Sequence, residues 1–245
     1  MKAIIVAGGK GTRLRPLTEN KPKPMIEVAG KPILEHTLNL LISHGINEFI
    51  FALCYLPNVI QNYFGDGSKF DVKIDYIYED EQTPLGTAGA IVAASTAIKE
   101  TFIVTYADIL RKLNVRDMIN KHQEKKAFAT INVYQRFGID PKSMIVFDEQ
   151  DKINSFIERP SLDRINKEFV WANGSFYIFE PEIFNLIPKN SSVDFGKDIF
   201  PLLLTTKKRF YCYPTKDFFI DIGNHQKLSL AKDKFIPPEL NSTKE

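Results

Sequence analysis

The stretch Gly8-Gly9-Lys10-Gly11-Thr12-Arg13-Leu14 follows directly on the short apolar run Ala3–Ala7. An apolar run of this length that ends in glycines is typical of a buried strand entering a loop. Glycines at that point let backbone N–H groups approach phosphate oxygens, because no Cβ stands in the way. The stretch lacks the third glycine of a dinucleotide-binding fingerprint and the terminal Gly-Lys-Ser/Thr of a Walker loop. It therefore predicts a phosphate-binding loop of a different kind.

Strands and helices alternate after this loop. The expected strands of the first half are 3–7, 48–55, 72–78 and 102–106, and the expected helices are 33–44, 58–64, 88–98 and 115–122. This alternation predicts βαβ units and a parallel sheet with helices on both faces. The second half is richer in strands, expected at 127–134, 144–147, 152–158, 169–179, 209–213 and 218–222. No linker separates the halves, so we expect an α/β fold with a Rossmann-like mixed, mostly parallel sheet in a single domain over 1–235, followed by a loose tail at 236–245.

The composition excludes several classes of protein. The chain has 245 residues, of which 44% are hydrophobic and 25% charged, and its formal net charge is +2. These values are typical of a globular protein and argue against a disordered chain or a nucleic-acid-binding protein that relies on bulk charge. Two cysteines are too few for a disulfide framework, which favours a cytoplasmic location. We find no signal peptide and no membrane span in the sequence.

A second basic element, Lys21-Pro22-Lys23-Pro24, lies close to the glycine loop in the sequence. Each proline fixes its own φ angle and holds the preceding lysine in extended geometry. Two lysines therefore project from a stiff segment, and Arg13 and Arg15 add two further cations. A solvated basic loop is the simpler interpretation, but the combination with a glycine loop favours the binding of a polyphosphate.

Two aspartates are candidates for metal ligands. Asp108 follows the expected strand at 102–106, and Asp221 lies inside the apolar strand at 218–222. A carboxylate in an apolar strand costs free energy unless it is paired or bound to a metal. Magnesium in nucleotide sites takes one or two carboxylates together with phosphate oxygens. The two aspartates meet that requirement, although Asp108 alone also fits a cap or a turn.

The glycine stretch, extended through Thr18 and followed by Lys21-Pro22-Lys23-Pro24-Met25, resembles the signature of the sugar-1-phosphate nucleotidyltransferases. The resemblance covers nearly the whole chain. It also includes Gly30-Lys31-Pro32-Ile33-Leu34, Pro84-Leu85-Gly86-Thr87-Ala88-Gly89-Ala90, Asp108, Glu158-Arg159-Pro160, Asn173-Gly174, Asp194-Phe195-Gly196-Lys197-Asp198 and Asp221-Ile222-Gly223. It implies that a sugar 1-phosphate oxygen attacks the α-phosphorus of a nucleoside triphosphate (NTP), which gives a nucleotide-sugar and pyrophosphate.

The resemblance also assigns roles to residues, with 1–125 as a nucleotide-binding half and 126–235 as a sugar-phosphate-binding half. The implied catalytic residues are Arg13, Lys23 and Asp108, and Asp108 and Asp221 are the implied ligands of Mg²⁺. The implied nucleotide-binding residues are Ala7, Gly8, Gly9, Gly11, Thr12, Arg13, Glu81, Gly86 and Thr87. The implied sugar-phosphate-binding residues are Lys23, Glu158, Arg159, Asn173, Gly174 and Asp194.

Three positions qualify these assignments. The family usually has glycine where this chain has Ala107, and lysine where it has Arg159, whose planar guanidinium changes the contact geometry. Asp194 fits a helix N-cap as well as a sugar contact.

Several substrate pairs are compatible with the sequence. The run Glu79-Asp80-Glu81 is acidic, and a carboxylate there would accept hydrogen bonds from the two adjacent donors of guanine. The motif forms are most similar to those of mannose- and heptose-1-phosphate guanylyltransferases. We therefore expect GTP with mannose 1-phosphate or D-glycero-D-manno-heptose 1-phosphate. The alternatives are UTP, CTP, dTTP or ATP with glucose 1-phosphate or a related sugar, or a non-catalytic regulatory subunit of the same fold. A homodimer is also open, and we expect neither a nucleic-acid nor a membrane partner.

Overall fold

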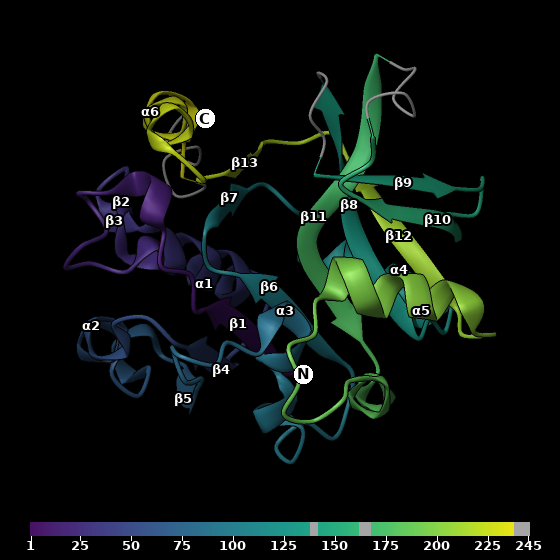
Figure 1. Ribbon diagram of the computed structural model, residues 1–245, viewed down its shortest axis with the longest axis horizontal. Helices are drawn as coiled ribbons and strands as arrows, with labels where there is room; N and C mark the ends of the chain where they lie inside the picture. The colour runs from purple at the N-terminus through teal and green to yellow at the C-terminus, as the bar shows by residue number, and fades with distance from the viewer. Residues whose placement is uncertain (138–141, 162–167, 238–245) are drawn as a thin grey trace.

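The computed structural model describes residues 1–137, 142–161 and 168–237 (Figure 1). In the first half the elements are β1 (Ala3–Ala7), β2 (Glu27–Val28), β3 (Lys31–Pro32), α1 (Ile33–Ser43), β4 (Glu48–Leu53), α2 (Pro57–Phe64), β5 (Lys73–Tyr78), α3 (Gly86–Gly89), β6 (Phe102–Tyr106), β7 (Ile109–Arg111) and α4 (Val115–Glu124). In the second half they are β8 (Ala129–Phe137), β9 (Ser143–Phe147), β10 (Ile153–Glu158), β11 (Phe169–Phe179), α5 (Phe200–Thr205), β12 (Phe210–Thr215), β13 (Phe219–Asp221) and α6 (His225–Lys234).

Within the described residues, a mixed sheet of nine strands joins the two halves of the chain. Its main path runs β10-β9-β11-β6-β1-β4-β5, while β8 branches from β11 and β12 pairs in parallel with β8. Strands β6, β1, β4 and β5 are parallel, whereas β11 is antiparallel to β6. The predicted mixed α/β sheet in a single domain is therefore confirmed, and β11 is the strand that makes it continuous. Within the described residues, no helix is both long and apolar enough to cross a membrane.

The alternating side chains of β1 show how the two faces of the sheet are covered. Ala3, Ile5 and Ala7 are buried with residues of α1, α2 and α4 on one face. Ile4 is buried on the other face with residues of α3, α5 and the helical turn Phe195–Ile199. A strand whose side chains are buried on both sides has a continuous apolar run in its sequence, as is the case here. The prediction of helices on both faces is thus confirmed.

The segment 88–98 departs from the prediction of one regular helix. It consists of α3, which ends at Gly89, and a separate 3₁₀ turn, Val92–Ala94. Ala88 N and Gly89 N both donate to Val193 O, at 2.9 and 3.2 Å. Contact with the second half therefore holds this segment against the sheet in short turns, and tertiary packing overrides the helix propensity of its alanines.

A small two-stranded ribbon lies outside the main sheet. The sequence predicts that the strand containing Asp221 extends the main sheet, but β13 instead pairs antiparallel with β7, a strand that the sequence did not predict. In this pairing Asp221 lies opposite Ile109, the residue after Asp108. The ribbon therefore brings together two aspartates that are more than a hundred positions apart in the chain.

Candidate functional site

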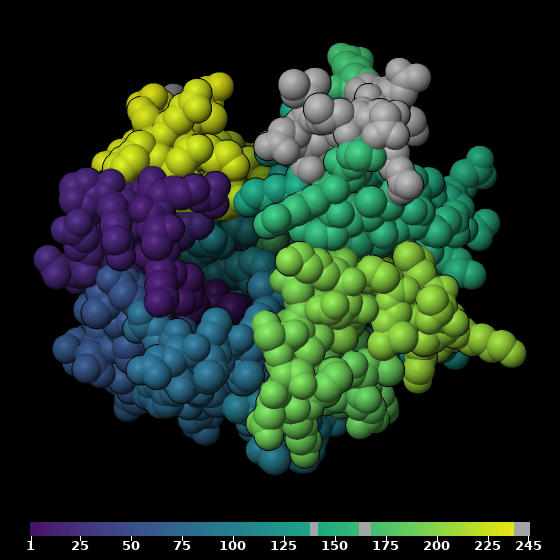
Figure 2. Space-filling view, viewed as in Figure 1, coloured from purple at the N-terminus to yellow at the C-terminus, as the bar shows by residue number. Residues whose placement is uncertain are grey.

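A cavity of about 440 Å³ opens where β1 and β6 end, which is where ligands bind in open α/β sheets. Figure 2 shows the corresponding face hollowed between the N-terminal segment, the C-terminal helix and the second half of the chain. The predicted site residues that line the cavity are Ala7, Gly8, Gly9, Lys23, Gly86, Thr87, Asp108, Glu158, Asn173, Asp194 and Asp221. Residues from both halves of the chain thus share one cavity.

Six predicted site residues do not contribute to this lining, namely Gly11, Thr12, Arg13, Glu81, Arg159 and Gly174. Gly11 has a left-handed φ of 64°. A Cβ there would lie 3.0 Å from Lys23 Cβ and from Thr18 Cγ2, so the loop packs directly on the Lys23 side chain. The guanidinium of Arg13 lies against Gly223, just beyond Asp221. Gly11 and Arg13 therefore border the cavity.

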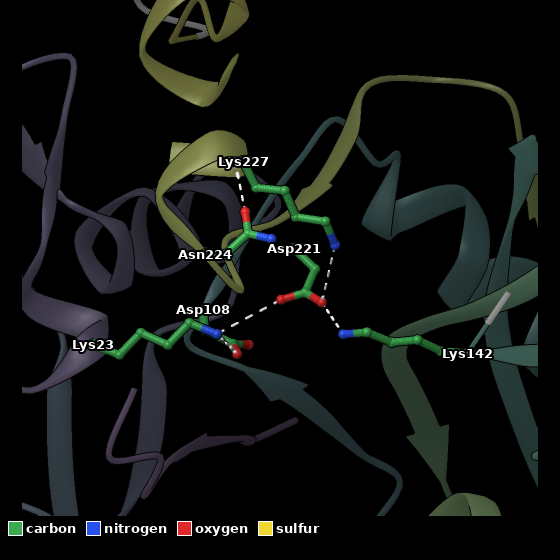
Figure 3. A network of polar contacts seen from close by, with 6 residues as sticks. All are labelled: Lys23, Asp108, Lys142, Asp221, Asn224 and Lys227. Atoms are coloured by element: carbon green, nitrogen blue, oxygen red, sulfur yellow. Dashed lines mark hydrogen bonds and ion pairs between the residues drawn. The ribbon is translucent and has the colours of Figure 1, made fainter. Parts of the chain in front are cut away.

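Lys23 lies between the two aspartates (Figure 3). Its Nζ is 2.5 Å from Asp108 Oδ2 and 3.6 Å from Asp221 Oδ1. Its side chain is 10% exposed, because the 3₁₀ turn Lys23–Met25 places it against the glycine loop. A carboxylate from the turn between β6 and β7 and a second one from β13 therefore face one buried ammonium group.

Asp221 contacts two further lysines that the sequence did not single out. Lys142 forms an ion pair with Asp221 Oδ2, and Lys227 Nζ is 3.8 Å from the same oxygen. Burial raises the pKa of Asp221, but the charges of Lys142, Lys23 and Lys227 outweigh this effect and hold the pKa below its usual value. Asp221 is therefore ionised at neutral pH, and Lys23 and Lys142 supply positive charge where they line the cavity beside it.

The donor set fits a divalent cation that also takes ligands from a substrate. Within the described residues, no group of three or more His, Cys, Asp or Glu side chains is placed to hold a metal ion. Asp108 and Asp221 alone supply two carboxylates, and both already face a cation, the Lys23 ammonium. Magnesium bound through one or two carboxylates completes its coordination with phosphate oxygens and water. The arrangement therefore suits Mg²⁺ that binds together with a phosphate compound.

The acidic run contributes a different carboxylate from the predicted one. Glu81 forms an exposed ion pair with Lys10, at 2.7 Å, whereas Glu79 lines the cavity. Glu79 Oε2 accepts a hydrogen bond from Leu85 N at 3.1 Å. Burial raises the pKa of Glu79, although this hydrogen bond opposes the increase. The position of Glu79 directly after β5, at the carboxyl end of a parallel strand, is the sequence signal that distinguishes it from Glu81.

The opposite wall carries two neighbouring carboxylates. Asp194 Oδ1 accepts from Gly196 N and Lys197 N, at 2.8 and 3.1 Å, and is the N-cap of the turn Phe195–Ile199. Its Oδ2 accepts from Thr87 Oγ1 at 2.8 Å. Burial raises the pKa of Glu158, and the charge of Asp194 adds to the increase. Asp194 is thus a cap that also lines the cavity, so the two interpretations of its sequence position are compatible.

A bulge in β11, the kind of irregularity that a glycine inside a strand favours, places Asn173 in the cavity. The pairing of β11 with β8 shifts register between Asn173 and Tyr177. A Cβ at Gly174 would lie 2.3 Å from Asn132 Oδ1, which leaves room only for glycine. Buried Arg111 of β7 donates to Gly174 O at 2.7 Å and to Ser175 O at 3.3 Å. No sequence pattern pointed to Arg111, which holds the bulge from the ribbon side.

Replacing Arg111 by alanine is expected to lower the free energy of unfolding by about 2–4 kcal/mol, because two backbone carbonyls lose a charged donor inside the protein. Burial lowers the pKa of Arg111 to about 10, so the guanidinium remains protonated at neutral pH. Urea unfolding of both proteins measures the difference. Arg116→Ala removes an exposed arginine that donates to His44 O and should cost less than about 0.5 kcal/mol. Equal losses in the two variants would contradict a special role for Arg111.

The chain is similar in sequence to known proteins over most of its length. The Nucleotidyl transferase family matches residues 2–236. The chain is 34% identical over 236 residues to the UTP–glucose-1-phosphate uridylyltransferase of Synechocystis sp., covering 91% of this chain and 60% of that protein. It is 33% identical over 228 residues to the mannose-1-phosphate guanylyltransferase of Mycobacterium tuberculosis, covering 90% of this chain and 60% of that protein. The chain therefore spans about 60% of the length of these curated relatives.

A solved structure is similar along nearly its whole length. HddC from Yersinia pseudotuberculosis, crystallised in complex with GMP-PN, superposes with a TM-score of 0.78 at 28% sequence identity. The match covers 96% of this chain and 99% of that one. Because the family model matches residues 2–236, nearly the whole chain, the chain belongs to the Nucleotidyl transferase family.

Proposed function

We propose that this chain transfers a nucleotidyl group from an NTP to a sugar 1-phosphate and releases pyrophosphate. The observation that carries the proposal is the position of Lys23 between Asp108 and Asp221, in a cavity walled by the glycine loop on one side and by Glu158, Asn173 and Asp194 on the other. Both substrates are anions, so the reaction needs cations that bring them together. A cavity with carboxylates for a metal ion and lysines for phosphates meets that need.

The nucleotide half of the cavity supplies positioning and charge. Gly8 and Gly9 line the cavity, and backbone N–H groups of a glycine loop are suited to phosphate oxygens. Arg13, beside Gly223, is suited to the β- and γ-phosphates, which leave as pyrophosphate. Lys23 is suited to the α-phosphate, where negative charge is concentrated during the transfer. Asp108 and Asp221 would hold Mg²⁺, which supplies charge neutralisation to the phosphates when bound.

For the base we propose guanine, with Glu79 as the carboxylate that accepts from its two adjacent donors. Glu79 lines the cavity beside Gly8 and Gly86, and relatives of this chain include proteins named mannose-1-phosphate guanylyltransferase. A uridylyltransferase is among the relatives at similar identity, so UTP with glucose 1-phosphate is the second candidate. For the sugar we propose mannose 1-phosphate or the related heptose 1-phosphate, bound against Glu158, Asn173 and Asp194.

Glu79→Gln is expected to raise the KM for GTP about tenfold. The carboxylate has two charged oxygens that accept from the two guanine donors, whereas the amide is neutral and has only one acceptor oxygen. The raised pKa of Glu79, caused by burial, means that its carboxylate binds a proton at higher pH than an exposed glutamate does. The KM of the unmodified protein should therefore increase as pH falls towards that pKa, and Glu79→Gln should remove this dependence. Glu81→Gln is the matched control, with an expected change below about twofold. If Glu81→Gln raised the KM for GTP more than Glu79→Gln does, Glu81 and not Glu79 would be the carboxylate that binds guanine.

Pyrophosphate release by the purified protein tests the function as a whole. The assay combines GTP, UTP, CTP, ATP and dTTP with mannose, glucose and heptose 1-phosphates in the presence of Mg²⁺. Release with GTP and one of the manno-configured sugars supports the proposal in full, and release with another pair supports the reaction but corrects the substrates. A protein that binds nucleotide without turnover of any pair would favour the regulatory-subunit alternative.

A further inference from the structure

We propose that Lys142 is the residue whose ammonium group contacts the phosphate of the sugar 1-phosphate, the contact that the family resemblance assigns to Arg159. This inference rests on the proposed function and adds a specific binding residue to it.

Lys142 reaches the reaction centre from the second half of the chain. It precedes β9 directly, lines the cavity, and pairs with Asp221 Oδ2. Lys23 and Lys142 approach Asp221 from opposite sides (Figure 3). Lys23 comes from the nucleotide side, beside the glycine loop, and Lys142 comes from the wall that carries Glu158 and Asn173. Each half of the cavity thus places one lysine at the same carboxylate.

The neighbouring strand explains why Arg159 does not occupy this position. In the antiparallel pair of β9 and β10, Glu158 lies opposite Ser143, and Arg159 N donates to Lys142 O at 2.8 Å. Glu158 and Ser143 both line the cavity, whereas Arg159 does not. Arg159 has a left-handed φ of 48°, so the chain leaves the extended conformation there. Lys142, at the other end of this hydrogen bond, therefore supplies the cation on the cavity side of the strand pair.

The side chain of Lys142 is accessible to a substrate, although its ammonium group pairs with Asp221 in the free protein. Its side chain is 58% exposed, compared with 10% for Lys23. The flexible stem of a lysine lets a point charge move over several ångströms at small cost. When Asp221 is engaged by a divalent cation, its charge is shared, and an incoming phosphate is the stronger partner for Lys142. The residue binds the sugar phosphate electrostatically and takes no part in bond making or breaking.

Steady-state kinetics of Lys142→Ala test this assignment. We expect the KM for the sugar 1-phosphate to rise about 10- to 100-fold, as for the loss of a charge-assisted contact, and the KM for the NTP to stay within about twofold. Lys142→Arg should recover most of the affinity, because it restores the charge. Arg159→Gly removes the other candidate for the phosphate contact, and glycine adopts the left-handed conformation of this position without strain. This variant should change the KM for the sugar 1-phosphate by less than about threefold.

A second control separates contact with substrate from the ion pair with Asp221. Lys227→Ala also removes a cation from Asp221 Oδ2, but Lys227 does not line the cavity. Its KM for the sugar 1-phosphate should stay within about threefold of the starting value. If Lys227→Ala raises this KM as much as Lys142→Ala does, or if Arg159→Gly has the larger effect, the assignment of Lys142 is wrong.

Calorimetric titration with mannose 1-phosphate and glucose 1-phosphate distinguishes this inference from the proposed function. Turnover by the unmodified protein together with an unchanged KM in Lys142→Ala would overturn the inference alone. Failure of the unmodified protein both to turn over any pair and to bind either sugar phosphate would overturn the function and the inference together. Binding without turnover, weakened about tenfold in Lys142→Ala, would support Lys142 as a ligand and overturn catalysis.

Discussion

Replacing Lys23 by methionine is expected to lower kcat by about 10²-fold or more, because the transition state loses a preorganised cation at the phosphorus under attack. Methionine keeps the length of the side chain without its charge, and circular dichroism checks that the fold is retained. Lys21→Met is the matched control from the same stiff segment. Lys21 is exposed and pairs with Glu27 at 3.2 Å, and we expect its loss to change kcat by less than about threefold.

The same variant should bind a divalent cation more tightly before substrate arrives. Lys23 Nζ contacts both Asp108 and Asp221, so in the free protein it competes with a metal ion for them. Removing this competitor should increase the affinity for Mn²⁺, used as a spectroscopic probe, by about tenfold. Loss of turnover with tighter metal binding separates a catalytic role of Lys23 from a role in holding the metal. Unchanged Mn²⁺ affinity would mean that the metal binds elsewhere.

The elements that the sequence predicted well are those in which local pattern and tertiary packing agree. The apolar run Ala3–Ala7 and the helix Ile33–Ser43 have the expected bounds within one residue. Gly45 follows the end of that helix with a left-handed φ of 86°, a conformation that helices commonly end in and that glycine adopts readily. A glycine inside an aromatic strand indicates either a bulge or a close ligand approach, and at Gly174 the structure has the bulge.

The parts that the sequence missed depend on contacts between distant segments. β7 is three residues long and has no pattern of its own, and it forms because β13 pairs with it. Lys142 matches no motif, and its position at Asp221 depends on how β9 enters the second half of the sheet. Glu79 and Glu81 are two residues apart in one acidic run, so only the end of β5 decides which of them faces the cavity.

The proposed division near residue 125, the homodimer and the cytoplasmic location stay predictions. Residues 238–245 of the expected tail lie outside the described residues.

Asp221→Asn should lower kcat of the metal-dependent reaction by about 10²- to 10³-fold, because the cation loses one of its two carboxylates. The substitution should also strengthen the binding of free pyrophosphate. Lys23, Lys142 and Lys227 would then surround a neutral amide, and the net positive charge of this end of the cavity would increase. Asp217→Asn, an exposed aspartate two residues before β13, controls for the change in overall charge and should leave both quantities within about twofold.

The decisive comparison combines Asp221→Asn with Asp108→Asn. If the two carboxylates hold one ion, either substitution alone removes most of its effect, and the double variant should lose little more than the stronger single variant. If they act independently, the two losses multiply, and the double variant falls about 10⁴-fold or further. The first result is expected because both carboxylates face a single Lys23 ammonium group, at 2.5 and 3.6 Å. The pairing of β7 with β13 brings them together, since Asp108 directly precedes β7 and Asp221 ends β13. A multiplicative loss would show that Asp108 and Asp221 serve different partners during the reaction.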